Sequence, residues 1–147
     1  MSQALAMFNS VGGAHFSQMV CTMAPYFSTI NPELTALQPG RAEAVVPFRK
    51  EITNHLGTVH AIALCNVAEF VGGLMTDASI PSGARWIPKG MTVAYLAKAR
   101  GDVRAVADGG QVDWSTSGDK EVDVIVTDPE GQVVFTARIT MNVKLAD

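Results

Sequence analysis

The most constraining feature of this sequence is an apolar segment at residues 58–75 that is too evenly hydrophobic to form a surface helix. Its apolar side chains cover nearly the whole circumference of a helix: Val59, Ile62, Leu64, Val67, Ala68, Phe70, Val71, Leu74 and Met75. A surface helix carries one apolar stripe, whereas a helix that is apolar nearly all round is buried. Thr58 is placed to be its N-cap. The rest of the chain must therefore enclose this helix.

One line of mostly small or polar side chains runs along the same segment and contains a single carboxylate, Glu69. Its members recur at helical spacing: Ile62, Cys65, Asn66, Glu69, Gly72, Gly73 and Thr76. Burying an unpaired carboxylate is costly. We therefore expect Glu69 to be paired, to lie at a subunit boundary, or to face a cavity. Gly72 and Gly73, one turn beyond it, predict room for a ligand.

Length and composition indicate one domain, residues 1–147, that associates with copies of itself. The chain is 48% hydrophobic and only 17% charged, which favours a homo-oligomer. The formal net charge of -3, without a run of Lys or Arg, argues against a nucleic acid or an anionic membrane as partner. Cys21 and Cys65 lie in apolar helical patterns, so free thiols are expected rather than a disulfide.

No pattern predicts a metal site or export from the cytoplasm. No spacing of Cys and His is typical of zinc. The first basic residue is Arg41, so the amino terminus lacks the charged start of a signal peptide. No apolar run reaches the ~18 residues needed to span a bilayer. We therefore expect a cytoplasmic protein without a membrane span.

The amino-terminal region predicts an extra helix after a break at Gly12-Gly13. Its apolar stripe recurs at helical spacing: Phe16, Met19, Val20, Met23 and Phe27. Pro25 is expected to end or kink it. Such a helix either covers an edge or the mouth of a sheet, or lines a channel for an acyl or aryl group. Loops are predicted at Asn31-Pro32 and at residues 38–40.

The remaining segments predict antiparallel strands. Strands are expected at residues 41–50, 89–98 and 102–107, and the clearest alternation is a long hairpin at residues 122–145 around the turn at 128–131. An antiparallel sheet with one apolar face needs a cover, and only the segment at 58–77 is hydrophobic enough to be wrapped by it. The pattern therefore predicts an α+β fold, with a curved antiparallel sheet around one long central helix.

The loop and helix start at residues 54–60, reading NHLGTVH, together with Glu69, resemble a known family. The match is to the hot-dog-fold acyl-CoA thioesterases of the phenylacetate-pathway and 4-hydroxybenzoyl-CoA types, and particularly to their uncharacterised bacterial branch, DUF4442. The order of elements from Arg41 to the carboxyl terminus is similar as well. The resemblance implies a hot-dog fold and hydrolysis of a fatty-acyl or aryl-acyl thioester.

The resemblance also implies catalytic roles for four positions. An amide at Asn54 helps to place the attacking water or the thioester, the backbone N–H of Ala61 polarises the thioester carbonyl, and Glu69 is the general base or nucleophile. His60, beside Ala61, contacts the substrate or a neighbouring backbone group. His55, Gly57, Gly72, Gly73 and Thr76 are the expected substrate-binding residues.

Thioester hydrolysis suits such an arrangement because a helix N-terminus offers free N–H groups and a positive dipole end to the oxyanion. Nine residues separate His60 from Glu69, which is ~13 Å along a helix axis. One subunit therefore cannot easily bring its own Ala61 and Glu69 to a single carbonyl. A facing helix from a second subunit closes the gap, so a homodimer or a dimer of dimers is expected.

Two alternatives to a thioesterase remain open. His60-Ala61-Ile62 stands where the family more often has His-Gly-Gly, which keeps a non-catalytic acyl-CoA or lipid-binding protein in view. The spacing of His55 and Glu69 resembles that of hot-dog dehydratases or hydratases, but the Pro-containing elements that follow the histidine there are missing. The expected partner is an acyl-CoA or acyl-carrier thioester. No cofactor is expected, since coenzyme A would be part of the substrate.

Overall fold

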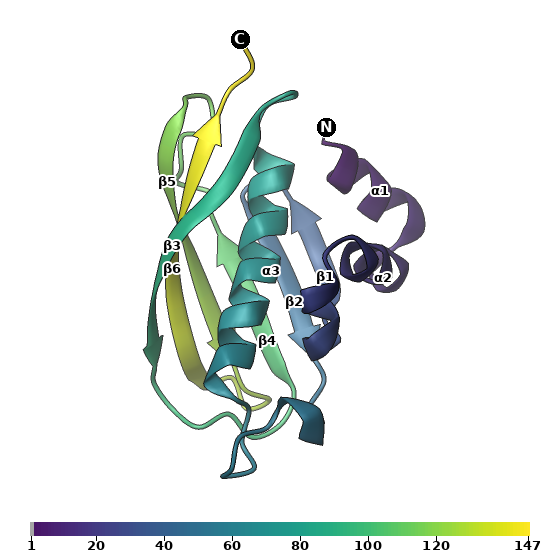
Figure 1. Ribbon diagram of the computed structural model, residues 1–147, viewed down its shortest axis with the longest axis vertical. Helices are drawn as coiled ribbons and strands as arrows, with labels where there is room; N and C mark the ends of the chain where they lie inside the picture. Colours follow the sequence, from purple (N-terminus) through teal and green to yellow (C-terminus); the bar gives the residue numbers. More distant parts are fainter. Residues whose placement is uncertain (1) are drawn as a thin grey trace.

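The chain forms a six-stranded antiparallel sheet that curves around one long helix, and the computed structural model describes residues 2–147 (Figure 1). In chain order the elements are α1 (Gln3–Val11), α2 (Gly13–Met23), η1 (Pro25–Ile30), β1 (Glu33–Gln38), β2 (Arg41–Val46), η2 (Lys50–Ile52), α3 (Ala61–Ser79), β3 (Arg85–Tyr95), β4 (Val103–Asp108), β5 (Gly118–Thr127) and β6 (Val133–Lys144). The α+β fold with a wrapped central helix is thus confirmed.

The strand order β1-β2-β4-β5-β6-β3 leaves β1 and β3 as the two edges of the sheet. The predicted hairpin is β5 and β6, whose registers run from Gly118 opposite Val143 to Thr127 opposite Val133. Alternate side chains of this hairpin are buried, among them Val122, Val124, Ile139 and Met141. Their period of two directs one apolar face of the sheet toward α3.

Helix α3 fills the concave side of the sheet, and eleven of its 19 residues are buried. It begins at Ala61, so the prediction of Thr58 as its N-cap was wrong. His60 is the cap instead, because its ring Nδ1 accepts a hydrogen bond from the Ile62 N–H at 3.0 Å. By length and composition alone α3 could span a membrane. It is mostly buried inside the fold, however, as the core helix of a soluble protein is.

Two helices, rather than the single extra helix predicted, precede the sheet. Gly12 separates α1 from α2 with φ at 84°, and Pro25 begins the short η1 turn after α2 ends. Figure 1 shows α1 and α2 beside β1, at the edge of the sheet away from β3. The prediction that this region covers an edge of the sheet is therefore confirmed.

Strand boundaries differ from the predictions in several places. β2 ends at Val46 rather than at residue 50, β5 begins at Gly118 rather than at residue 122, and the largest differences are at β1 and β3. β1 was missed, because its six residues lie between Asn31-Pro32 and Pro39-Gly40, which both indicate loops. β3 begins at Arg85, before the predicted start at residue 89, and continues through Pro88. A register shift between Pro88 and Gly90 makes a bulge in it. Proline and a bulge are both typical of an edge strand.

Candidate active site

The loop before α3 is held by the side chain of Asn54. Its Oδ1 accepts hydrogen bonds from the N–H groups of Leu56 at 2.9 Å and Thr58 at 3.2 Å, and its Nδ2 donates to the buried hydroxyl of Thr58 at 3.0 Å. Gly57 has φ at 76°, which favours glycine in this turn. Asn54 and Gly57 therefore shape the loop, and one Nδ2 hydrogen of Asn54 is left for another acceptor.

The backbone N–H of Ala61 is the first of α3, and no acceptor for it lies within residues 2–147. Ala61 lines a cavity of about 310 Å³ together with Asn54 and the segment at residues 95–99 that follows β3. The positive end of the helix dipole and a free N–H thus meet at an open cavity, which suits an oxyanion. His60, by contrast, is exposed and lines a different cavity.

Glu69 lies two turns farther along α3, at a second cavity of about 250 Å³. The cavity is bounded by Pro88, Gly90 and Met91 of β3 and by Ile139 of β6. The Glu69 side chain is half-buried, and the described part of the chain offers it neither a hydrogen bond nor an ion pair. A carboxylate without a partner beside apolar walls can act as an acceptor toward a water or a substrate.

Tyr95 of β3 contacts Cys65, which stands between Ala61 and Glu69 on the same side of α3. The Tyr95 hydroxyl and Cys65 Sγ are 3.6 Å apart, and this hydrogen bond is the main reason why the pKa of Tyr95 is raised. Tyr95 also lines the cavity at Ala61. The sequence analysis missed Tyr95 as a site residue, although the alternation along residues 89–98 put it on one face with Met91 and Val93.

One copy of the chain does not bring Ala61 and Glu69 together. They are eight residues apart on a continuous helix, which is ~12 Å along its axis. They also line separate cavities. A single carbonyl can therefore meet both groups only if one of them comes from another copy.

Three of the predicted substrate-binding residues, Gly72, Gly73 and Thr76, are buried inside their own chain. A Cβ on Gly72 would lie 2.9 Å from Ile139, and a Cβ on Gly73 would lie 2.8 Å from the Trp86 ring. Thr76 is fully buried, and its hydroxyl donates to the Gly72 carbonyl at 2.8 Å. Side chains of the sheet thus pack closely against both glycines. His55 is exposed in the turn before α3.

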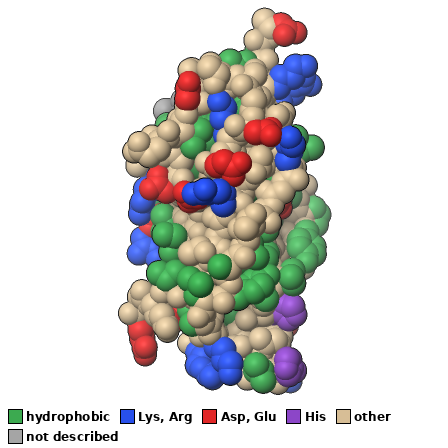
Figure 2. Space-filling view, turned by 90° about the vertical axis from the view of Figure 1, so that its left-hand side faces the viewer, with side chains coloured by type: hydrophobic (Ala, Val, Ile, Leu, Met, Phe, Trp, Pro, Cys, Tyr) green, Lys and Arg blue, Asp and Glu red, His purple; other side chains and the backbone are tan. Residues whose placement is uncertain are grey.

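The face that carries β3 exposes large apolar side chains. Ile87, Met91, Tyr95 and Leu96 are 62%, 39%, 54% and 56% exposed. Figure 2 shows hydrophobic side chains gathered in the lower half of this face, with most of the acidic and basic ones above them. An edge strand with unpaired backbone groups and apolar side chains is a template for pairing with another strand.

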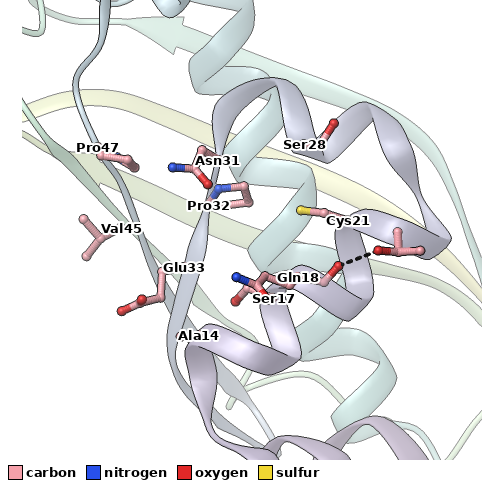
Figure 3. Close-up of a pocket in the computed structure, with 11 residues that line it drawn as sticks. Ala14, Ser17, Gln18, Cys21, Ser28, Asn31, Pro32, Glu33, Val45 and Pro47 are labelled. Carbon is pink, nitrogen blue, oxygen red and sulfur yellow. Dashed lines mark hydrogen bonds between the residues drawn. The ribbon is translucent and has the colours of Figure 1, made fainter.

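The largest cavity lies elsewhere, between α2 and the strands β1 and β2, and holds about 560 Å³ (Figure 3). Gln18 and Cys21 of α2 line one wall, and Asn31 and Glu33 lie across from them. Burial raises the pKa of the Cys21 thiol, so the thiol stays protonated and weakly nucleophilic. None of the predicted site residues reaches this cavity.

Comparisons with known proteins agree on the fold. The family described as Domain of unknown function (DUF4442) matches residues 12–143. The crystal structure of the genomics target APC5556 is 56% identical, covers 98% of this chain and 97% of its own, and has a TM-score of 0.90. No curated protein sequence matches significantly.

Two solved structures named as thioesterases share the fold at lower identity. Thioesterase HI1161 of Haemophilus influenzae is 18% identical with a TM-score of 0.72, over 81% of this chain and 82% of its own. The probable thioesterase PA5026 of Pseudomonas aeruginosa is 24% identical with a TM-score of 0.69, over 82% and 87%. The curved sheet around α3 is thus the hot-dog fold.

Proposed function

This chain belongs to the DUF4442 family and has a hot-dog fold, and on that premise we propose that it hydrolyses acyl-CoA thioesters by attack of a water that Glu69 activates. The observation that carries the proposal is the free N–H of Ala61 at the start of a 19-residue helix, facing a cavity. The unpartnered Glu69 carboxylate on the same helix supplies the base.

Each group matches one requirement of the reaction. Water must lose a proton as it attacks the carbonyl carbon, and Glu69 accepts that proton. The carbonyl oxygen becomes an oxyanion, which the Ala61 N–H and the dipole of α3 stabilise. The tetrahedral intermediate then expels the coenzyme A thiolate, which takes up the proton held by Glu69, and the carboxylic acid remains. The free Nδ2 hydrogen of Asn54 orients the thioester in the cavity that it shares with Ala61.

The proposed enzyme is a homodimer in which each site takes Ala61 from one copy and Glu69 from the other. The ~12 Å between these residues along α3 makes the second copy necessary. The exposed β3 edge is the natural meeting place, because Glu69 lies against the β3 bulge and Tyr95 at the end of β3 lies at the Ala61 cavity. Pairing of two β3 edges would bury the apolar side chains exposed there.

Two variants test the catalytic roles separately. Glu69→Gln keeps the size of the side chain and removes the base, and thiol release should fall ~100-fold or more. Ala61→Pro removes the N–H and keeps the fold, because proline is favoured at the first helical position. Its predecessor, His60, already has φ at -63° and ψ at 138°, the extended conformation that a following proline requires. Ala61→Ser, which retains the N–H, is the matched control.

Mixing the two inactive variants tests the shared site. A heterodimer of Glu69→Gln and Ala61→Pro has one site with both intact groups and one site with neither. Refolding the two together should therefore restore thiol release from a panel of acyl-CoAs to up to about a quarter of the wild-type rate, since half of the dimers are mixed and each has one working site. Without recovery, the sharing of the site is contradicted. If the wild type releases no thiol from any member of the panel, the alternative of acyl-CoA binding without turnover replaces hydrolysis.

A further inference from the structure

The segment that follows β3 forms one wall of the Ala61 cavity and carries two exposed basic residues, Lys98 and Arg100. Of the described residues that line the cavity, Lys98 alone is charged. Ala99 between the two basic residues is buried, and its carbonyl accepts a hydrogen bond from the Val59 N–H at 2.9 Å. Lys98 and Arg100 therefore lie on the outer side of this segment, beside the loop that leads into α3.

Neither basic side chain forms an ion pair within the described part of the chain. Five other basic residues do form one: Arg41, Arg49, Lys89, Arg104 and Arg138. The carboxylate closest in sequence, Asp102, accepts a hydrogen bond from the backbone N–H of Phe48 at 2.6 Å instead. Lys98 and Arg100 are thus available to an anion from outside the chain.

The loops around the Ala61 cavity are positively charged although the whole chain is not. Residues 49–60 and 96–102 contain four basic and two acidic residues, in a chain with a formal net charge of -3. Figure 2 shows basic and histidine side chains at the lower end of the molecule, the end at which α3 begins in Figure 1. A negatively charged chain attracts a polyanion such as coenzyme A only where its local charge is positive.

The length of the pantetheine arm of coenzyme A brings its phosphates out of the cavity. About thirteen bonds separate the thioester sulfur from the first phosphorus, which is ~16 Å when the arm is extended. That length is more than twice the edge of a cube with the volume of the Ala61 cavity, about 310 Å³. When the thioester carbonyl lies at the Ala61 N–H, the phosphates must therefore lie among exposed side chains at or beyond the rim.

We infer that Lys98, with Arg100 beside it, binds a phosphate group of the coenzyme A part of the substrate and so favours coenzyme A thioesters over thioesters of uncharged thiols. This inference rests on the proposed hydrolysis at Ala61. The Lys98 ammonium group attracts a phosphate as a point charge, and the Arg100 guanidinium can donate to two phosphate oxygens at once. Lys98 and Arg100 are binding residues in this assignment and take no part in the chemical step.

The test compares an acyl-CoA with the pantetheine thioester of the same acyl group, which has the same arm but no phosphate. kcat/KM should be about tenfold higher for the acyl-CoA, and added salt should lower this ratio because it screens exposed charges. Lys98→Glu should bring the ratio to about one or below, because repulsion replaces attraction. Arg100→Glu should lower it less, since Arg100 does not line the cavity. Lys144→Glu makes the same change of charge at the far end of β6 and should keep the ratio of the wild type.

The 4′-phosphopantetheine thioester identifies the phosphate that is bound. It carries only the first phosphate of coenzyme A, which acyl carrier proteins also carry. A kcat/KM equal to that of the acyl-CoA supports binding of this shared phosphate, so that a carrier-protein thioester could use the same site. A kcat/KM equal to that of the pantetheine thioester supports binding of a phosphate that only coenzyme A has.

Each result decides the inference separately from the hydrolysis. Equal kcat/KM for the acyl-CoA and the pantetheine thioester in the wild type, or an unchanged ratio in Lys98→Glu, overturns the inference and leaves hydrolysis standing. If the wild type releases no thiol, the dissociation constants of coenzyme A and pantetheine are measured by calorimetry. A tenfold preference for coenzyme A that Lys98→Glu removes then supports the phosphate site although hydrolysis fails. Equal constants, or no binding of either compound, overturn both.

Discussion

The two edges of the sheet differ in how far the chain covers them. At β1 the chain covers its own edge: α2 packs beside it, and the N–H of Leu34 donates to Ser17 Oγ at 2.8 Å. Leu34 and Leu37 are buried there. β3 is nearly twice as long, and all of its 11 residues are exposed or only partly buried. No helix or loop of the described chain covers it in the same way.

The difference between the two edges identifies β3 as the edge at which the proposed second copy would pair. An exposed apolar edge invites pairing, and natural proteins usually cover or charge such an edge. Here the uncovered edge is also the one beside Glu69 and Tyr95, the residues nearest to the proposed chemistry. The covered edge carries no candidate catalytic residue. In the proposed homodimer, covering β1 and leaving β3 open would direct association to the side where the shared site would form.

The largest expected effect comes from charging the open edge. Ile87→Lys with Ala94→Lys places charges on exposed β3 positions that line neither the Ala61 cavity nor the Glu69 cavity. Two lysine-bearing edges repel each other, so we expect a monomer by sedimentation and a loss of thiol release of ~100-fold or more, since Ala61 and Glu69 no longer meet. The free energy of unfolding of the monomer should change by about 0.5 kcal/mol at most, because these are surface positions.

Ile125→Lys is the matched control for this double variant. Ile125 is 47% exposed but lies on β5, an interior strand of the sheet. It should leave both association and thiol release as in the wild type. If the β3 double variant keeps the oligomeric state and the thiol release of the wild type, the β3 edge is not the surface through which two copies associate.

The fold could be predicted from the sequence where local pattern and tertiary environment agree. The alternation of Val122, Val124 and Val126 reports one buried face directly, and the even hydrophobicity of α3 reports enclosure. The same logic failed at β1, because prolines on both sides obscured a six-residue strand. It failed at the start of α3 because the cap is a histidine ring, and histidine is not among the preferred N-cap residues.

The candidate site was only partly predictable for a physical reason. A glycine in a buried helix has the same appearance in a sequence whether a ligand or another part of the chain lies against it, and at Gly73 the neighbour is the ring of Trp86. Ala61 and Lys98 line one cavity although they are far apart in the chain. Such a relation between distant residues leaves no trace in local spacing.

A second prediction compares the same substitution at the two edges. A Cβ on Gly13 would lie 2.1 Å from the carbonyl oxygen of Leu34, whereas a Cβ on Gly90 meets nothing within 4 Å. Backbone cannot move aside as a flexible side chain can, so Gly13→Ala should lower the free energy of unfolding by about 3 kcal/mol in urea titrations. Gly90→Ala should leave the monomer unchanged.

The comparison of Gly13→Ala with Gly90→Ala is informative because alanine has a higher helix propensity than glycine. A helical Gly→Ala change gains up to about 1 kcal/mol, so a loss at Gly13 must come from the contact with β1. Equal free energies of unfolding for the two variants would show that α2 is not packed tightly against the β1 edge. Weaker association of Gly90→Ala with unchanged monomer stability would place a second copy against the β3 bulge.

The smallest expected effect separates covering an edge from hydrogen bonding to it. Ser17→Ala leaves the buried N–H of Leu34 without its acceptor, so the free energy of unfolding should fall by about 1–2 kcal/mol, with faster hydrogen exchange at Leu34. Thr22→Ala on the same helix removes an exposed hydroxyl that bonds only within α2, to the Gln18 carbonyl at 3.0 Å, and should cost about 0.5 kcal/mol at most. If both variants are equally stable, packing of α2 alone protects the β1 edge. In that case what β3 lacks is an apolar cover rather than a hydrogen-bond partner, and a second copy would be held there chiefly by its side chains.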